Sequence, residues 1–332
     1  MMTRRETFVG GMAVAAASRA LAAMADCARP VLILAPSNLG LRPNGDGSEP
    51  GTWAAPAVLM GFGLAKRIAA VATWRLARPA YAYEPQAGTR IRNGNGIRAF
   101  SIELGALVSK ALAKGSFPVV IGGDCSILLG CLLGARSLGR VGLIHVDGHS
   151  DFFHPGNYDT SRSLGAAAGM DLALATGRGE PLLTQWPGIG GPLAKDEDTL
   201  QLGERNALDP DFGKYYADVL TTRITRLIIQ NVRTEGIDAT IARVAGWIRG
   251  RRLARTWLHV DLDVLDESSL PAVDSPGSPG LDYDELARLV HGLKRTGSVL
   301  GVNFSIYDPD RDPDRRYAPW IVDCIARGVG CR

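Results

Sequence analysis

The stretch "VGLIHVDGHSDF", residues 141–152, is an apolar run that ends abruptly in polar residues. The run is too short for a helix of ordinary length, and its apolar residues are continuous rather than alternating with polar ones. That pattern is typical of a strand buried on both faces of a parallel sheet. Asp147, His149 and Asp151 then stand at alternate positions directly after the run. We therefore expect a buried strand whose carboxyl end carries functional side chains.

Similar runs recur along the chain and are separated by amphipathic stretches of helix length. The runs are RPVLILAPS from residue 29, FPVVIGGD from 117, RLIIQNVRT from 226, TWLHVDLDVLD from 256 and VLGVNFSIYDP from 299. The expected helices cover residues 54–72, 99–114, 126–138, 237–249 and 282–295. Because strands and helices alternate, the sequence predicts a three-layer α/β/α fold with a mostly parallel central sheet and right-handed crossovers.

Length and composition are consistent with one large domain. Of the 332 residues, 46% are hydrophobic and 21% are charged, which suffices to bury one extended core. We place a single domain at residues 31–328. The net charge of +3 gives no reason to expect a polyanionic partner, so nucleic-acid binding is disfavoured. The five cysteines make no disulfide framework in a chain of this length.

The first 25 residues are similar to a twin-arginine export signal. Arg4 and Arg5 precede a short apolar run, and the segment ends at Ala23-Met24-Ala25, an A-x-A cleavage pattern. The apolar run is too short to span a membrane. We predict a signal peptide at residues 1–25, a periplasmic location and no membrane association of the mature protein. A cytoplasmic protein with an alanine-rich first helix is the alternative.

Two acidic clusters follow two of the predicted strands. Asp147, His149 and Asp151 form one cluster, and Asp261 and Asp263 form the other. A lone aspartate at a strand end is most often a cap or a turn former. Several buried like charges without a counter-ion would each cost several kcal/mol. A dinuclear divalent metal site resolves this conflict, and mixed carboxylate and imidazole ligands suit Mn²⁺, or Fe²⁺ and Zn²⁺ less decisively.

Three motifs in order resemble the metal-binding motifs of the arginase family, the ureohydrolases. They are GGDCS at 122–126, VDGHSDF at 146–152 and HVDLDVLD at 259–266, against the usual GGDHS, DAHxD and SxDxDxxDP. The resemblance spans about residues 31–326. It implies two manganese ions bridged by Asp147 and Asp261, with Asp151 on the first ion, and with His149 and Asp263 on the second.

The resemblance also implies a reaction. A hydroxide between the two ions would attack the amidine carbon of a small guanidino or amidino substrate. Asp151 would shuttle a proton, and an amine and urea or a urea analogue would leave. Family members are commonly trimers or hexamers, so a homo-oligomer is expected.

Cys125 departs from the family pattern, because it stands where a histidine of the first metal is expected. A thiolate ligand would draw the site towards zinc or iron. A thiol that does not ligate would leave the first metal weakly held. A nucleophilic role needs a neighbouring base, and the sequence shows none. The charge of the site favours Cys125 as a ligand or near-ligand.

The residues expected at the substrate also depart from the family. Ile306 and Asn303 replace the glutamate that grips a guanidinium and the aspartate before it, and Ala168 replaces a histidine. Asp308 is close in sequence and could compensate for the glutamate, although an adjacent position on a strand points the other way. The residues predicted to bind substrate are Phe153, which replaces an asparagine, together with Asn157 and Asp308.

The remaining histidines have open roles. His154 follows the second motif and could reach substrate or replace the missing imidazole, so we include it with Asp151 as a catalytic candidate. His145 and His259 each precede a predicted ligand by two residues. Each of these two histidines is expected either to hydrogen-bond to that ligand carboxylate or to lie in the core as a histidine with satisfied hydrogen bonds.

The sequence therefore predicts a metal-dependent hydrolase that cleaves a linear C–N bond in a guanidino or amidino compound, with arginine itself disfavoured. A metal-binding but catalytically silent homologue is the first alternative. A deacetylase on the same sheet architecture is the second, but it would need a His-His pair, which the sequence lacks.

Overall fold

The computed structural model describes residues 29–83, 88–157, 165–210, 212–215 and 217–330. The predicted signal peptide at residues 1–25 lies outside the described residues. No helix within those ranges is both long and apolar enough to cross a membrane.

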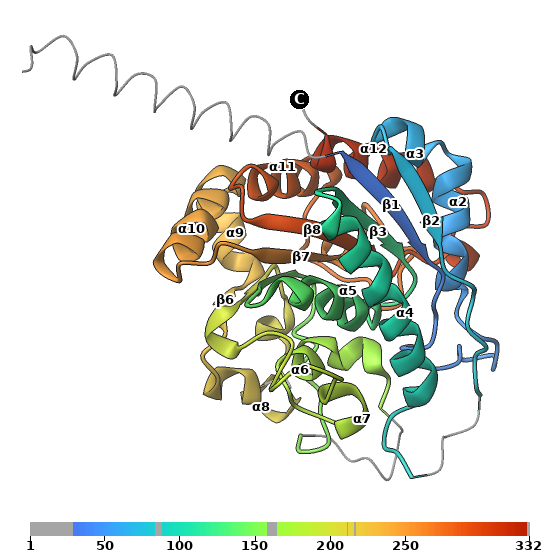
Figure 1. Ribbon diagram of the computed structural model, residues 1–332, viewed down its shortest axis with the longest axis horizontal. Coiled ribbons are helices and arrows are strands. Elements are labelled where there is room, and N and C mark those ends of the chain that lie inside the picture. The colour runs from blue at the N-terminus through green and yellow to red at the C-terminus, as the bar shows by residue number, and fades with distance from the viewer. Residues whose placement is uncertain (1–28, 84–87, 158–164, 211, 216, 331–332) are drawn as a thin grey trace, which may run out of the picture.

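A single sheet of eight parallel strands forms the centre of the described structure, in the order β2-β1-β3-β8-β7-β4-β5-β6 (Figure 1). The strands are β1 (Pro30–Ala35), β2 (Ala72–Arg75), β3 (Phe117–Gly122), β4 (Gly142–Val146), β5 (Thr199–Leu202), β6 (Thr225–Leu227), β7 (Thr256–Asp261) and β8 (Val299–Ser305). The predicted α/β fold with a parallel sheet is confirmed. Because all strands run the same way, their carboxyl ends share one edge, where ligands bind in sheets of this kind.

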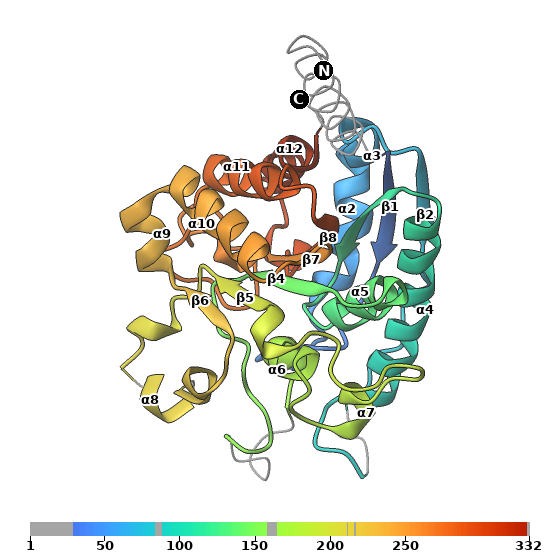
Figure 2. The same cartoon turned by 60° about the vertical axis from the view of Figure 1, so that its left-hand side comes forward.

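Helices cover both faces of the sheet (Figures 1 and 2). Helices α4 (Gly94–Ala113), α5 (Ile127–Ala135), α6 (Asp171–Ala175) and α7 (Pro181–Thr184) pack on one face. The opposite face carries α2 (Ala55–Gly61), α3 (Leu64–Arg67), α9 (Ile229–Glu235), α10 (Ile237–Gly250), α11 (Tyr283–Lys294) and α12 (Ala318–Val329). Helix α8 (Phe212–Tyr215) and 3-10 turns such as η7 (Leu262–Val264) and η8 (Pro309–Arg311) lie in the connections.

Strand β4 shows why the predicted strands are apolar without interruption. Leu143 packs among the side chains of the α4–α7 face, whereas Ile144 and Val146 belong to the core on the other face. Alternate side chains of a strand point to opposite faces, and here both faces are covered. His145 and Asp147 therefore point towards the α4–α7 face, and both are 0% exposed.

Two of the predicted elements differ from the structure. The run RLIIQNVRT was expected to be a strand, but only Thr225–Leu227 pairs with β5, and Ile229–Glu235 forms α9. Ile229 and Val232, three positions apart, bury against the core as one side of a helix does, and a short apolar run does not distinguish the two cases. The helix expected at 54–72 is divided at Gly63, which has a φ of 82°, and the edge strand β2 begins at residue 72.

Asp198, just before β5, offers a test of the packing at the opposite end of the sheet. It is 1% exposed and accepts hydrogen bonds from Arg140 Nε at 2.7 Å and Nη2 at 2.6 Å. The hydrogen bonds from Arg140 lower the pKa of Asp198. Asp198→Asn should reduce the free energy of unfolding by about 1–3 kcal/mol at neutral pH. Urea denaturation measures the change.

The pH dependence of this effect follows from the sign of the shift. Because the pKa of Asp198 is lower in the folded state, its ionised form stabilises the fold at pH values above the unfolded-state pKa of about 3.9. This stabilisation is lost as the pH falls below that value. The difference between wild type and variant should therefore shrink in acid. Asp238→Asn is the matched control, because Asp238 is 84% exposed in its ion pair with Arg288. An equal loss in both variants would contradict the prediction.

Candidate metal centre

The GGDCS turn between β3 and α5 is fastened to the loop after β1. A side chain at Gly123 would place its Cβ 2.2 Å from the carbonyl oxygen of Ser37, so only glycine fits. The backbone N–H of Asp124 donates to that oxygen at 3.1 Å, and Asp124 Oδ2 accepts from Ser37 Oγ at 2.6 Å. Cys125, 2% exposed, is thereby held at the carboxyl edge of the sheet.

The second motif is tied to the third through its backbone. His149 N donates to Asp147 Oδ1 at 2.5 Å, and Gly148 N donates to Asp263 Oδ1 at 3.0 Å. The guanidinium of Arg205 lies against Gly148, where a Cβ would come within 2.2 Å of it, and Arg205 Nη2 donates to the carbonyl oxygen of Asp263 at 2.6 Å. These contacts fix the spacing between β4 and β7 at the site.

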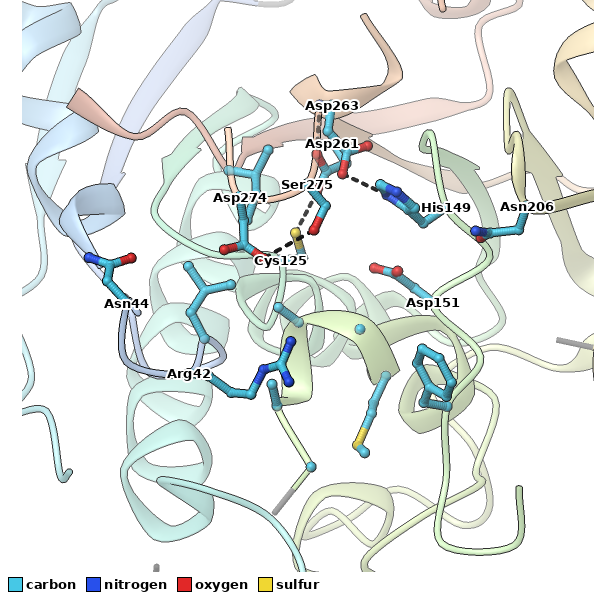
Figure 3. A pocket seen from close by; sticks show the side chains of 18 of the residues that line it. Arg42, Asn44, Cys125, His149, Asp151, Asn206, Asp261, Asp263, Asp274 and Ser275 are labelled. Carbon is cyan, nitrogen blue, oxygen red and sulfur yellow. Dashed lines mark hydrogen bonds and ion pairs between the residues drawn. The ribbon is translucent and has the colours of Figure 1, made fainter. Parts of the chain in front are cut away.

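The side chains of the third motif meet those of the first two (Figure 3). The Cys125 thiol donates to Asp261 Oδ2, and Asp261 Oδ1 accepts from Asp263 N at 2.8 Å. His149 Nδ1 lies 2.8 Å from Asp263 Oδ2. One ligand atom each of Asp147, His149 and Asp151 lie within 4.8 Å of one another. The fold thus brings the six predicted metal-ligating residues to one place.

Asp151 reaches this place through an unusual backbone conformation. Its φ is 44°, in the left-handed region that aspartate tolerates better than most residues. Its carbonyl oxygen accepts from Ala173 N at 3.2 Å, which anchors the turn beside α6. The carboxylate consequently faces the pocket, as Figure 3 shows.

The cluster holds more negative charge than its surroundings balance. Burial, followed by the nearby Asp151, raises the pKa of Asp147 well above its usual value, and burial with Asp263 does the same for Asp261. Burial also acts to raise the pKa of Asp263, but His149, Arg205 and the Gly148 N–H together outweigh it and the net shift is downward. Asp263 in turn outweighs the effect of burial on His149 and raises the pKa of that imidazole.

A divalent cation fits this centre. Asp147 Oδ2 is buried and has no hydrogen-bond partner, although a buried carboxylate oxygen needs a donor or a cation. Carboxylate and imidazole ligands suit divalent first-row metals. The residues that would hold such ions are Asp147, His149, Asp151, Asp261 and Asp263, with the Cys125 thiol beside Asp261.

The centre opens into a pocket of about 830 Å³. Its wall includes Arg42 and Asn44 from the loop after β1, and Asp274 and Ser275 from the loop after the third motif (Figure 3). Phe153, predicted to bind substrate, also lines it. The pocket is therefore polar, with both charge signs on its wall.

His154 and Asn157 do not line this pocket. Asn157 Oδ1 accepts from His154 N at 2.9 Å, and its Nδ2 donates to the carbonyl oxygen of Phe152 at 2.9 Å. His154 Nε2 lies 3.2 Å from Asp218 Oδ2 instead. The structure thus places His154 and Asn157 in the turn after the second motif, where both side chains make hydrogen bonds, and not on the pocket wall.

Asp308 is not among the residues that line the pocket either. It is 2% exposed, and its oxygens accept from Gly51 N at 3.2 Å and Asp310 N at 2.9 Å. These bonds cap η8 and hold the loop that precedes α2. Strand β8 ends at Ser305, and the Asp308 carboxylate beyond it is bound by these two backbone N–H groups.

Sequence reasoning missed several charged residues of the site. Arg42, Asp274 and Arg311 line the pocket but stand in loops without periodicity. Asp171 is 0% exposed and lies 3.0 Å from His145 Nε2 through its Oδ1. The sequence did contain a signal for Asp171, which is the one charged residue in the apolar stretch GAAAGMDLALA. An apolar stretch is expected to be buried, and a charged residue within it is then expected to have a partner.

Residues 91–327, more than half of the chain, match the sequence model of the Arginase family. The chain belongs to the arginase family. The arginase of Bacillus caldovelox is 31% identical over 240 residues, which cover 71% of this chain and 76% of that protein.

Two solved structures show the same fold. Arginase from Bacillus subtilis superimposes with a TM-score of 0.76 at 22% identity and covers 91% of this chain and 98% of its own. Trypanosoma cruzi formiminoglutamase with Mn²⁺ has a TM-score of 0.65 at 19% identity and covers 92% and 93%. The arginase-like α/β fold is therefore shared across these ureohydrolases.

Membership of the arginase family establishes the reaction class. The protein is a metal-binding hydrolase that acts on C–N bonds in linear amidines, with small guanidino compounds as substrates. Members of the family use a binuclear metal cluster, commonly of Mn²⁺. The clustered carboxylates described above are the candidate ligands in this chain.

The stability of the metal-free protein should depend on these carboxylates. Because burial raises the pKa of Asp147 and Asp261, the folded state binds more protons than the unfolded state. Stability should therefore fall as the pH rises from about 4 to 7. Asp261→Asn should weaken this fall, and thermal unfolding of chelator-treated protein measures it.

Adding Mn²⁺ supplies the control. A metal bound only by the folded state stabilises it by about 2.7 kcal/mol at 100 times the dissociation constant. Wild type should gain this stability and Asp261→Asn should gain much less. A metal-free variant with the same pH dependence as wild type would contradict the electrostatic account.

Proposed function

We propose that this protein hydrolyses a modified guanidino compound, such as an N-substituted arginine, and releases an amine and urea or a urea analogue. The observation that carries the proposal is Ile306, an apolar side chain on the pocket wall where the resemblance predicts a glutamate. A protonated guanidinium gains nothing from an apolar neighbour. A guanidine with an electron-withdrawing N-substituent is less basic and depends less on that carboxylate.

The metal-binding residues are proposed to hold two Mn²⁺ ions, with Zn²⁺ or Fe²⁺ as alternatives because of the thiol. Asp147 and Asp261 would bridge the pair, Asp151 would serve the first ion, and His149 and Asp263 the second. Cys125 stands beside Asp261 as a ligand or near-ligand. When bound, a metal pair supplies Lewis acidity and a hydroxide nucleophile near neutral pH.

The protein's own residues would position the substrate and move the proton. Asp263 holds the ring of His149 through Nδ1, which fixes its orientation. Arg42 and Arg311 on the pocket wall would bind the carboxylate of an amino-acid substrate. The Asp151 carboxylate faces the same space and is proposed to pass a proton to the leaving amine nitrogen.

A second candidate is a homologue that binds metal without turnover. The replacements at Cys125 and Ile306 favour it, because both remove groups that the family pattern uses. Product release from arginine, N-hydroxyarginine, agmatine, guanidinobutyrate and formimidoylglutamate tests the two candidates. Absence of turnover with every divalent metal would leave only the second.

Ile306→Glu should create the missing guanidinium contact and raise kcat/KM for arginine at least about tenfold, equivalent to about 1.4 kcal/mol. The reason is that a carboxylate would then face the cationic substrate in the pocket. Steady-state kinetics with arginine and N-hydroxyarginine measures the change in preference.

Ile306→Gln is the matched control, because Ile306 has a φ of 73°. Such a conformation is costly for a β-branched residue, so any unbranched replacement relieves strain. The glutamine variant shares that relief without the charge and should leave the preference unchanged. Equal gains in both variants would argue against recognition by charge.

We also propose export to the periplasm by the twin-arginine route, with a cytoplasmic location as the alternative. Arg4 and Arg5 before the apolar run support this proposal. Replacing both with lysine should remove the protein from the periplasmic fraction and leave it in the cytoplasm. An unchanged distribution on cell fractionation would contradict it.

The mature protein is further proposed to assemble as a homo-oligomer, a trimer or hexamer, and to act on small molecules without nucleic-acid or membrane partners. Its family supports this, since arginase-like homologues are often oligomers. The small net charge of +3 is consistent with the absence of a polyanionic partner.

A further inference from the structure

A row of polar side chains crosses the sheet one step deeper than the carboxylate cluster. His145 of β4 pairs in register with His259 of β7, and His259 pairs with Asn303 of β8. All three are 0% exposed. Strand alternation points them to the α4–α7 face, the same face as Asp147 and Asp261 two residues later. The interior of the sheet is therefore polar directly beneath the metal centre.

Asp171, the first residue of α6, faces this row from above the sheet. Its Oδ1 lies 3.0 Å from His145 Nε2, and its Oδ2 lies 3.4 Å from His259 Nε2 without forming a hydrogen bond. The two imidazole rings stack with centroids 4.7 Å apart. Both Nε2 atoms thus converge on one buried carboxylate.

The hydrogen bonds of the row distinguish the two histidines. Trp257 Nε1 donates to Asn303 Oδ1 at 2.8 Å, and because an indole nitrogen is only a donor, the amide orientation of Asn303 is fixed. Asn303 Nδ2 then donates to His259 Nδ1 at 2.7 Å. A neutral His259 must therefore carry its proton on Nε2. His145 has no hydrogen-bond partner at Nδ1, and its Nε2 faces the Asp171 carboxylate, so Nε2 is the ring nitrogen that points to the carboxylate cluster.

The neighbouring ligand atoms point to the same nitrogen. His145 Nε2 lies 3.7 Å from Asp147 Oδ2, the buried oxygen without a hydrogen-bond partner. One ligand atom each of His145, Asp151 and Asp171 lie within 4.8 Å of one another. Cys125 belongs to none of the three such groups among the described residues. Its thiol donates to Asp261 instead.

We propose that His145 and Asp171 complete the ligand set of the first metal position together with Asp147 and Asp151, and that His145 supplies the imidazole that position 125 lacks. His259, which is held by Asn303, lies beside Asp171 and is not a ligand in this proposal. This proposal rests on the proposed metal-dependent function, and it adds two ligands that the three sequence motifs do not contain.

Metal content tests the proposal directly. The purified protein is stripped with chelator, reloaded with Mn²⁺, and analysed by mass spectrometry for metal equivalents and by calorimetry for affinity. Wild type should retain two ions. Asp171→Asn and His145→Gln should each lose one equivalent, a larger effect than the roughly tenfold to hundredfold weakening that removal of a residue outside the ligand set causes. Cys125→Ser should retain both ions.

The controls separate ligand loss from damage to the fold. His154→Gln removes an imidazole near the pocket but outside the cluster, and it should retain two ions. Asp171→Asn preserves the shape of the side chain, so it tests the proposal even if His145→Gln fails to fold, and circular dichroism checks both. Two ions at wild-type affinity in a folded Asp171→Asn protein would overturn the proposal.

Spectroscopy gives a readout that does not depend on activity. The Co²⁺-loaded protein should lack a thiolate-to-cobalt charge-transfer band, and the Zn²⁺ form should show no sulfur neighbour at about 2.3 Å by X-ray absorption. A sulfur signal that disappears in Cys125→Ser, with two ions retained in Asp171→Asn, would overturn the proposal.

Hydrolysis assays on the same preparations keep the two claims distinct. Two bound ions that depend on His145, without turnover of any amidine, would contradict the proposed function alone. Turnover in wild type with unchanged metal content in the His145 and Asp171 variants would contradict the ligand proposal alone.

Discussion

Buried negative charge at one edge of the sheet constrains the rest of this structure. Asp147, Asp261 and Asp263 are at most 5% exposed and come from neighbouring strands, so repulsion among them must be balanced within the protein. Few cationic side chains are near these carboxylates. His149 contacts the carboxylate of Asp263, whereas Arg205 donates to the backbone carbonyl oxygen of Asp263. Only a bound cation balances such a cluster without proton uptake, which is why the centre is best understood as a metal site.

The scaffold around this charge is rigid for a physical reason. Gly123 allows the first motif to touch the loop after β1, and Gly148 leaves room for the guanidinium of Arg205. Backbone hydrogen bonds then tie the second motif to the third. Ligands held in this way need little reorganisation when ions bind, so the geometry of the centre depends on the sheet rather than on long loops.

Recognition has changed more than metal binding. The carboxylates of the second and third motifs are all present, whereas position 306 is apolar and position 125 is a thiol. These changes are compatible with one another if the substrate is less basic than arginine and if a deeper imidazole serves the first metal. Arg42 and Arg311 leave the pocket able to bind an acidic group.

Much of the fold was predictable because its strands are buried on both faces and therefore carry uninterrupted apolar runs. One exception was the region after Leu227, where Ile228 is followed by the helix α9, because a short apolar run contains no period that separates helix from strand. The contacts of His154, Asn157 and Asp308 were not predictable for a different reason. Proximity in sequence to a ligand says nothing about direction once a strand has ended, and all three side chains satisfy local backbone or neighbouring groups instead.

The sequence by itself determined the alternation of strands and helices and the family to which the three motifs point, and it predicted the ligand types, because each motif is local and its residues are adjacent to one strand end. Only the tertiary structure decided which distant residues share the site. Asp171 reaches His145 from a helix on the covering layer, and Asn303 orients His259 across two strands. Such contacts depend on register and helix packing, which join residues far apart in the chain and leave no local pattern.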